Sequence, residues 1–314
     1  MSPLPEVTWG ILIALYLYLG GMAGGMWMFA FAADYVDKKS EKYYPAAKTA
    51  AYLAPLILIV GIAALVLDLS RPSVPPKGLL HILNVFNNPT SIMTIGSVII
   101  SAAAIIGLIT AVMYFANASR IWRLVFSFIS AILGFGTAAY TGILLSFARD
   151  VPLWDSGWLS WLFVTSGVSS GIAATIIATR ILGSFTPDYI LPEFKAIRDK
   201  WIEIAETLHR YDIYVMWMEL AMLIGWIVTI YARYGSLPLS WLTTGIAGAA
   251  FWAYIVLGWI VPVAMYYTLK GTKTILKVNI YLGAILIAVF AFALRFAVLY
   301  APQLAELAAG LPLH

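Results

Sequence analysis

The chain contains no cysteine, only three histidines, and few charged residues, which make up 11% of its 314 positions. Without cysteine it cannot form disulfides, ligate an iron–sulfur cluster or attach haem covalently. The histidines are His81, His209 and His314, and none lies deep inside an apolar stretch, so paired ligands for haem b are missing. We therefore expect no metal, haem or iron–sulfur cluster in this chain. If it takes part in redox chemistry, another subunit carries the metals.

Long hydrophobic runs fill most of the sequence, and 62% of the residues are hydrophobic, which excludes a soluble globular domain. There are eight such runs, each longer than the roughly 20 residues that cross about 30 Å of hydrocarbon. They are Trp9–Val36, Ala46–Leu69, Thr90–Ala116, Ile121–Ala148, Trp158–Gly183, Tyr211–Arg233, Ser240–Leu269 and Thr274–Ala301. Because the runs are continuous and do not alternate in polarity, they predict helices and not a barrel. We expect an all-α polytopic protein with eight transmembrane helices, surrounded by membrane lipid.

The basic residues are unevenly divided between the two sides of these helices. Of 19 Lys and Arg residues, fourteen lie in or beside the gaps after runs one, three, five and seven, four lie on the other side, and one lies within the last run. Basic residues favour the cytoplasmic side, so this pattern predicts both termini outside. The net charge of +4 comes from the inner loops, and no nucleic-acid partner is expected.

The longest connection divides the chain near its middle. Apolar residues recur every three or four positions within 186–210, which predicts an amphipathic helix linking two bundles on the inner surface. The expected halves are 1–148, with four helices, and 149–314, with four more. Small residues recur in the first helix of each half: Gly20, Gly21, Gly24 and Gly25, then Ser166, Gly167, Ser169, Ser170 and Gly171. The pattern indicates either a parallel repeat or only close helix packing.

Two further features mark the outer side. Tryptophans gather there and indicate an aromatic belt: Trp9, Trp154, Trp158, Trp161 and Trp241. The outer loop 70–89 is rich in proline and asparagine, which suits a platform for another protein.

Charged residues within the apolar runs are costly and are candidates for function. Glu219 lies about two turns into the sixth helix, and Asp212 lies seven residues earlier on nearly the same face. The pair could begin a proton path from the inside, or Glu219 could be a protonated structural acid. Arg295 could extend toward the outer interface or pair with a carboxylate such as Asp68.

Two polar positions near the outer ends of helices have alternative interpretations. Asp68 could pair with Arg71 at the interface, where Pro72 ends the helix. Tyr140 lies two turns before the end of the fourth helix; it could be a core tyrosine or could donate to a carbonyl such as that of a quinone.

Several segments in this order resemble the membrane anchors of the polysulfide reductase, or NrfD-like, family. They are Tyr16–Met26 (YLYLGGMAGGM), Leu67–Pro72 (LDLSRP), Asn87–Ser97 (NNPTSIMTIGS), Tyr140–Ser146 (YTGILLS), Pro152–Trp154 (PLW) and Leu162–Ala173 (LFVTSGVSSGIA). The resemblance covers most of the sequence.

The resemblance implies a haem-free, quinone-reactive subunit in the cell membrane of a prokaryote. It would oxidise menaquinol or a similar quinol and pass electrons to an outer iron–sulfur subunit, and a molybdopterin subunit would reduce a sulfur compound. Tyr140 matches a quinone-contacting tyrosine of the family, and we expect Asp68 to hold the quinol with it. A family member uses a polar pair in its first helix; this protein has no His or Asn there and offers instead Thr8, Trp9, Tyr16 and Tyr18. His81 in the outer loop could substitute for the missing residue.

Arg295 completes the residues expected near the quinone. Asp212 and Tyr254 are the candidates to connect Glu219 with that site. The alternative function is a secondary transporter built from two parallel four-helix repeats, which the glycine-rich helices, Glu219 and Arg295 would also suit.

Overall fold

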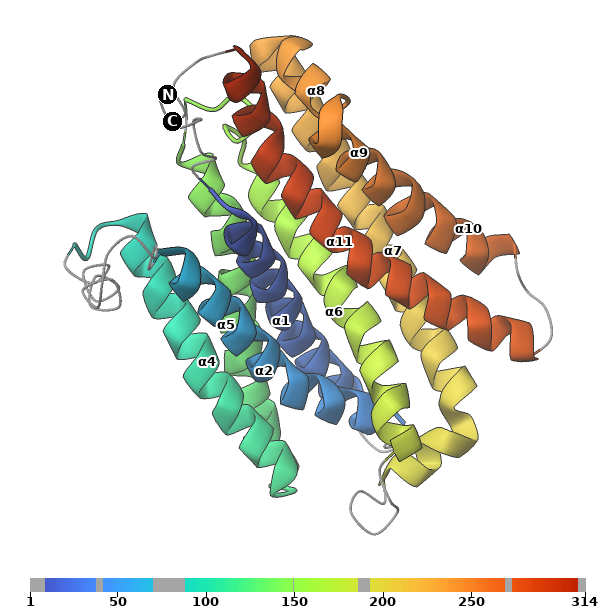
Figure 1. Ribbon diagram of the computed structural model, residues 1–314. Helices are drawn as coiled ribbons and strands as arrows, with labels where there is room; N and C mark the ends of the chain where they lie inside the picture. The colour runs from blue at the N-terminus through green and yellow to red at the C-terminus, as the bar shows by residue number, and fades with distance from the viewer. Residues whose placement is uncertain are drawn as a thin grey trace.

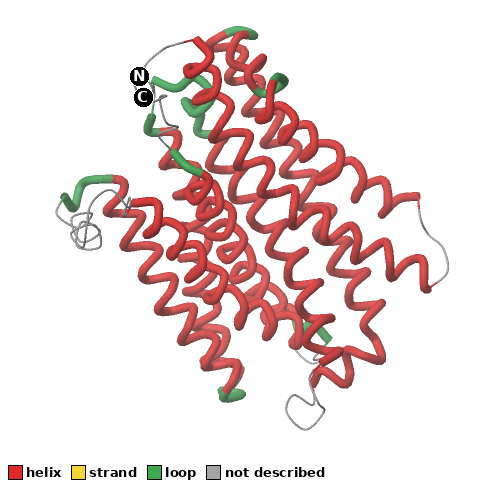
Figure 2. Tube along the Cα trace, in the orientation of Figure 1, coloured by secondary structure: helices red, strands yellow, loops and turns green. Residues whose placement is uncertain are grey.

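A computed structural model describes residues 9–37, 42–69, 88–148, 150–185, 193–268 and 273–309, and its regular secondary structure within these ranges is entirely helical. The elements are α1 (Ile11–Val36), α2 (Tyr44–Leu69), α4 (Ile92–Phe115), α5 (Arg120–Ser146), α6 (Trp158–Phe185), α7 (Glu193–Tyr234), α8 (Leu237–Trp241), α9 (Gly245–Ala253), η2 (Tyr254–Ile260), α10 (Val261–Thr268) and α11 (Lys273–Ala309). Eight helical spans in the described residues are long and apolar enough to cross a membrane, which confirms the predicted number. The chain is a multi-pass membrane protein, and its helices run side by side in one elongated bundle (Figures 1 and 2).

The start of α1 and the end of α11 lie at the same end of the bundle, here called the termini end (Figure 1). The backbone N–H of Trp9 donates to Oε1 of Gln303 at 3.0 Å and joins the two. The opposite end, here called the basic end, includes Lys42, Arg120 and Arg210. Eight crossings, an even number, require that the chain begins and ends on the same side of the membrane. The compartment that each end faces stays a prediction.

Glycines bring α1 into backbone contact with two helices at once. A Cβ added to Gly24 would overlap the carbonyl oxygen of Gly134 on α5, and one added to Gly25 would overlap that of Gly167 on α6. Helices in lipid gain little from hiding apolar surface, so their association depends on such close packing. The matched small residues of the first and fifth spans therefore face one another, whatever their evolutionary origin. The division into halves at 148/149 stays a prediction.

The seventh span differs from the helix predicted over 240–269. The short helix α8 ends at Trp241, and the span begins only at Gly245, whose φ of +63° places it in the left-handed region that favours glycine. The span then passes through the π-helical segment η2 before Pro262. Proline has no N–H and its ring clashes with the carbonyl four residues earlier, so a wider turn before it relieves an α-helical conflict.

The predicted link over 186–210 is not a separate element where the structure describes it. From Glu193 onward it is the first part of α7, a continuous helix of 42 residues; residues 186–192 lie outside the described ranges. Nζ of Lys42, which follows α1, lies 2.7 Å from Oε1 of Glu203 and connects the first half of the sequence to this helix. The hydrogen bond from Lys42 to Glu203 raises the pKa of the lysine. A location of 186–210 on the inner surface stays a prediction.

Four described residues between α5 and α6 are buried: Val151, Leu153, Trp154 and Ser156. Trp154 is 1% exposed, and its indole N–H donates to the carbonyl of Val298 at 2.8 Å; the indole of Trp226 donates to the carbonyl of Leu153 at 3.1 Å. The aromatic-belt interpretation is therefore wrong for Trp154, although the exposure of Trp158 and Trp161 agrees with it.

The glycine contacts predict a sharp difference between two substitutions. Gly25→Val should lower the free energy of unfolding by more than about 3 kcal/mol, above the usual cost of overpacking, because the obstructing atoms are backbone. Gly157→Ala is the control, since nothing lies within 4 Å of a Cβ there. Unfolding of the two purified variants in detergent, followed by circular dichroism, measures the difference. Equal stability of the two variants would contradict the backbone contact.

Candidate functional site

The predicted site residues fall into two polar groups on opposite sides of α1. Residues two positions apart on a helix point about 200° from each other, so Tyr16 and Tyr18 face different neighbours. Tyr16 faces α2 and α5, since its ring lies near Gly61 and Gly20 beside Thr137. Tyr18 faces α11, where its hydroxyl donates to the carbonyl of Ala288 at 2.6 Å. The structure therefore separates Tyr18 from Tyr140, although both were expected near the quinone.

Tyr16 and Tyr140 form the first group, here called the tyrosine pair. The ring of Tyr140 occupies the space of a missing side chain on α4, because a Cβ on Gly96 would overlap its Cζ. Tyr16 is 1% exposed and Tyr140 is 7% exposed, and the two phenols are close enough to interact electrostatically. Tyr16 is five residues from the start of α1 and Tyr140 six from the end of α5, so both lie about 8–9 Å below the termini end.

Neither phenol of the tyrosine pair has a hydrogen-bond partner in the described part of the protein. The hydroxyl of Tyr16 is fully buried without a partner. The hydroxyl of Tyr140 takes part in none of the hydrogen bonds of the described residues, although it is not one of the fully buried unpaired atoms. A buried hydroxyl left unpaired costs roughly 1–3 kcal/mol. Such groups are suited to hold the oxygens of a polar ligand that enters between α1, α4 and α5. The sequence offered both Tyr16 and Tyr18, and only the packing of α1 shows which one accompanies Tyr140.

Trp9 and Asp68 lie closer to the termini end than the tyrosine pair. Oδ1 of Asp68 would be 2.8 Å from a Cβ on Gly10, and its carboxylate interacts electrostatically with Tyr300 of α11. The ring of Trp9 packs against Trp154 with centroids 5.6 Å apart. Arg71 and His81 lie outside the described residues, so their predicted roles stay predictions.

Arg295 and Glu219 are the centre of the second group, here called the charged cluster. Arg295 is 0% exposed; its Nη1 donates to Oγ of Ser166 at 2.5 Å and its Nη2 to the carbonyl of Phe163 at 3.2 Å. The predicted pairing with Asp68 is wrong, because the hydrogen bonds of Arg295 within the described ranges are made to α6 and α11. Its full burial also excludes extension to the outer interface.

Glu219 compensates the charge of Arg295 without a direct ion pair. It is 3% exposed and interacts electrostatically with Arg295, and the hydroxyls of Ser166 and Tyr254 face it. Oε1 of Glu219 and the hydroxyl of Tyr254 still have no described partner at hydrogen-bond distance and angle. Tyr254 is the first residue of η2, and π-helical turns are frequent at functional sites. The predicted neighbours Glu219 and Tyr254 are thus brought together.

Asp212 extends the charged cluster toward the basic end. It is 0% exposed, and both of its carboxylate oxygens lack a hydrogen-bond partner among the residues described. The hydroxyl of Ser169 faces it, outside hydrogen-bonding geometry, and Asp212 interacts electrostatically with Glu219. The cluster is therefore a run of buried titratable and hydroxyl groups with unused hydrogen-bonding capacity. Such a run suits the movement of protons, with water completing the path.

No group of three or more His, Cys, Asp or Glu side chains in the described ranges could hold a metal ion.

Comparison with known proteins shows the class to which this bundle belongs. The family described as "Polysulphide reductase, NrfD" matches residues 3–306, and the protein is a member of it. Among curated proteins it is similar to the C subunit of polysulfide reductase from Wolinella succinogenes, with 28% identity over 95% of each sequence. It is also similar to the NrfD homolog of Haemophilus influenzae, with 25% identity over 96% of each sequence. NrfD of Escherichia coli is 25% identical over 95% of this sequence and 96% of its own. These comparisons give no support to a transporter.

The compensation between Arg295 and Glu219 predicts non-additive substitutions. Arg295→Met should lower the free energy of unfolding by about 3–5 kcal/mol, because it leaves the buried carboxylate uncompensated. Adding Glu219→Gln to that variant should recover part of the loss. Unfolding of both single variants and the double variant in detergent gives the coupling energy. Strictly additive losses would show that the two side chains do not interact.

Proposed function

We propose that this protein is the quinone-reactive membrane subunit of a respiratory reductase complex. It oxidises a quinol of the menaquinone type and passes the electrons to an iron–sulfur partner subunit. The observation that carries the proposal is the tyrosine pair, two buried phenols without described partners near one end of a membrane bundle. Membership of the polysulphide reductase family supports the assignment, as does the similarity to the C subunit of polysulfide reductase.

The tyrosine pair fits the chemistry of a quinol. A phenol both donates and accepts hydrogen bonds, so it can bind a ring oxygen in either protonation state. Tyr140 and Tyr16 together provide one such group for each of two oxygens, where Asp68 was expected to supply the second. The bound quinol supplies the redox chemistry; the protein binds it, orients it and accepts its protons.

Electrons and protons leave toward the termini end in this proposal. With the basic end inside, as the charge asymmetry predicts, the termini end faces outward. The iron–sulfur subunit docks there, close to the tyrosine pair, and a molybdopterin subunit on the same face reduces a sulfur compound such as polysulfide. Asp68 and Trp9 lie between the pair and that surface, and Asp68 is placed to accept protons that leave outward.

A second part of the proposal concerns the charged cluster. Glu219, Asp212 and Tyr254 form a proton path from the basic end, and Arg295 with Tyr18 extends it to α1. A buried carboxylate with an unpaired oxygen can exchange protons with neighbouring water, whereas a purely structural acid is expected to be fully hydrogen-bonded. The unpaired oxygens of Asp212 and Glu219 support the first role.

Replacement of Tyr140 tests the quinol site. Tyr140→Phe should slow quinol oxidation by roughly tenfold to a hundredfold, equivalent to about 1–3 kcal/mol for one buried hydrogen bond. Tyr16→Phe should have a similar effect, and assembly of the complex should be unchanged in both. Quinol oxidation by the purified complex gives the rates. Tyr231→Phe, at an exposed position on α7, is the control. Wild-type turnover and inhibitor affinity in Tyr140→Phe would make it a core tyrosine.

Glu219→Gln tests the proton path, because it keeps the size and hydrogen bonding of the side chain but removes its titratable group. Proton movement per electron, measured with the complex in sealed vesicles, should fall while quinol oxidation and subunit docking persist. Glu306→Gln, near the termini end of α11, is the matched control. A full proton-to-electron ratio in Glu219→Gln would leave a quinol-oxidising anchor without an inward proton path.

A further inference from the structure

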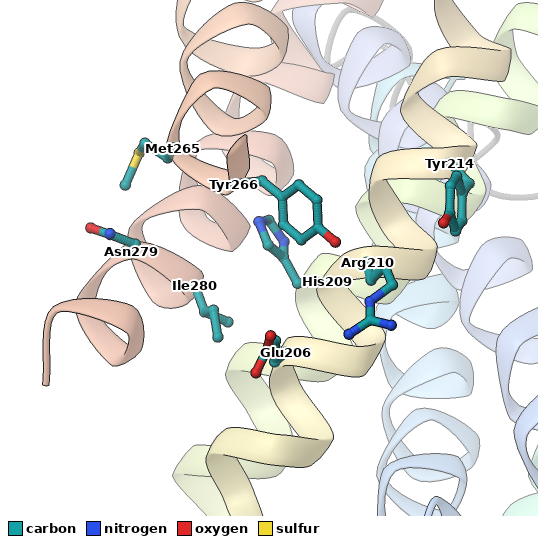
Figure 3. Close-up of a pocket in the computed structure, with 8 residues that line it drawn as sticks. All are labelled: Glu206, His209, Arg210, Tyr214, Met265, Tyr266, Asn279 and Ile280. Carbon is teal, nitrogen blue, oxygen red and sulfur yellow. The ribbon is translucent and has the colours of Figure 1, made fainter. Parts of the chain in front are cut away.

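A cavity of 330 Å³ opens at the basic end between α7, α10 and α11 (Figure 3). Polar side chains form much of its lining, among them Glu206, His209, Arg210 and Asn279. In Figure 3 the imidazole of His209 lies beside Tyr266, and the carboxylate of Glu206 lies on the same side of α7. The cavity has room for several water molecules, each of which occupies about 30 Å³ in the liquid.

His209 is held at the inner wall of this cavity with an unused hydrogen-bonding position. Its side chain is 3% exposed, and Nδ1 has no hydrogen-bond partner in the described residues. The ring packs against Tyr266, with centroids 5.6 Å apart, and a Cβ on Gly283 would lie 3.2 Å from its Cε1. Nδ2 of Asn279, in the same cavity, is also buried without a described partner. Buried polar groups of this kind are normally bonded to ordered water.

The depth of His209 places the cavity where water reaches it. His209 lies 25 residues before Tyr234, the last residue of α7, which is about 38 Å along a helix. That length exceeds the roughly 30 Å of the hydrocarbon core, so the cavity lies at headgroup level when Tyr234 is at the opposite interface. Glu219, about 23 Å from Tyr234, lies inside the core.

From His209 toward the middle of the membrane, the residues that follow lie on one face of α7. His209, Asp212, Met216 and Glu219 are spaced by three, four and three residues, which keeps them on one stripe of a helix. Asp212 has two unpaired oxygens, and Ser169 and Ser166 of α6 lie beside Asp212 and Glu219 respectively. Met216 interrupts the polar stripe on α7, whereas Ser166 and Ser169 are three residues apart on α6 and so share one face of that helix.

We propose that this cavity is the water inlet of the proton path and that His209 is its first proton-transfer residue. The imidazole accepts a proton from cavity water and gives one to Asp212, directly or through water. His209 therefore has the same number of protons after each transfer as before it. An imidazole suits this exchange because one ring nitrogen can accept a proton while the other donates one. The inference rests on the proposed function, since it supplies protons to Glu219.

The test uses the whole complex in sealed vesicles with the basic end facing a lumen that contains a pH dye. His209→Ala should slow proton uptake from the lumen by roughly tenfold or more, as expected for loss of a positioned proton-transfer group. Added imidazole should restore the uptake, because it fits the enlarged cavity and replaces the missing group. Met265→Ala enlarges the same cavity without removing a titratable group, and should take up protons normally and not respond to imidazole.

Other outcomes decide against the inlet. Normal uptake in His209→Ala, or a loss that imidazole does not restore in an assembled complex, overturns the role of His209. If His209→Ala does not assemble, His209→Gln fills the space without a titratable group, and normal uptake in that variant overturns it equally. Quinol oxidation is measured in the same vesicles. Wild-type turnover without uptake from the lumen overturns the inlet and the proton path that it feeds but leaves quinol oxidation standing, whereas no quinol turnover in the wild type overturns the proposed quinol site.

Discussion

Lipid surrounds this bundle, so apolar surface alone does not hold its helices together, and close backbone contact must do so. Gly24 and Gly25 place α1 against α5 on one side and α6 on the other, nearer than any residue with a side chain allows. This contact fixes which face of α1 meets which helix. It therefore decides that Tyr16 lies near Tyr140, and that Tyr18 is close enough to Arg295 to interact with it electrostatically.

At the basic end, some of the Lys and Arg residues that predict the membrane topology also make contacts between helices. Asp34 of α1 accepts a hydrogen bond from the hydroxyl of Tyr114 at 2.9 Å and lies 3.4 Å from Nε of Arg123. These contacts connect the ends of α1 and α4 to the start of α5. Lys48 is 1% exposed and lies 3.2 Å from Oδ1 of Asn117. Several of the cations that indicate topology are thus committed to contacts between helices.

Hydropathy predicted the eight spans because length and continuous apolarity are local properties. It missed the interruption of the helix between Trp241 and Gly245, since the sequence alone does not show that Gly245 has a positive φ. It could not choose between Tyr16 and Tyr18, because that choice depends on the orientation of α1. The sequence also suggested Asp68 as a partner of Arg295, but Arg295 donates to Ser166 and to the backbone carbonyl of Phe163, 132 positions away, and its Nε has no described partner. His209 was overlooked because its cavity exists only when α10 and α11 pack on α7.

Only the backbone of α1 separates the tyrosine pair from the charged cluster at Gly20 and Gly21, because neither residue has a side chain. Gly20 lies beside Tyr16, while a Cβ on Gly21 would be 3.2 Å from Nη2 of Arg295. A unit charge about 10 Å away, at an effective dielectric constant near 20, changes the energy of another charge by about 1.7 kcal/mol. Negative charge on a ligand beside the tyrosine pair would therefore be favoured by Arg295, and more strongly when Glu219 is neutral. If the proposed quinol site is occupied, a proton arriving on one side of α1 would in this way change the redox potential of the quinone on the other side, without any movement of the helix.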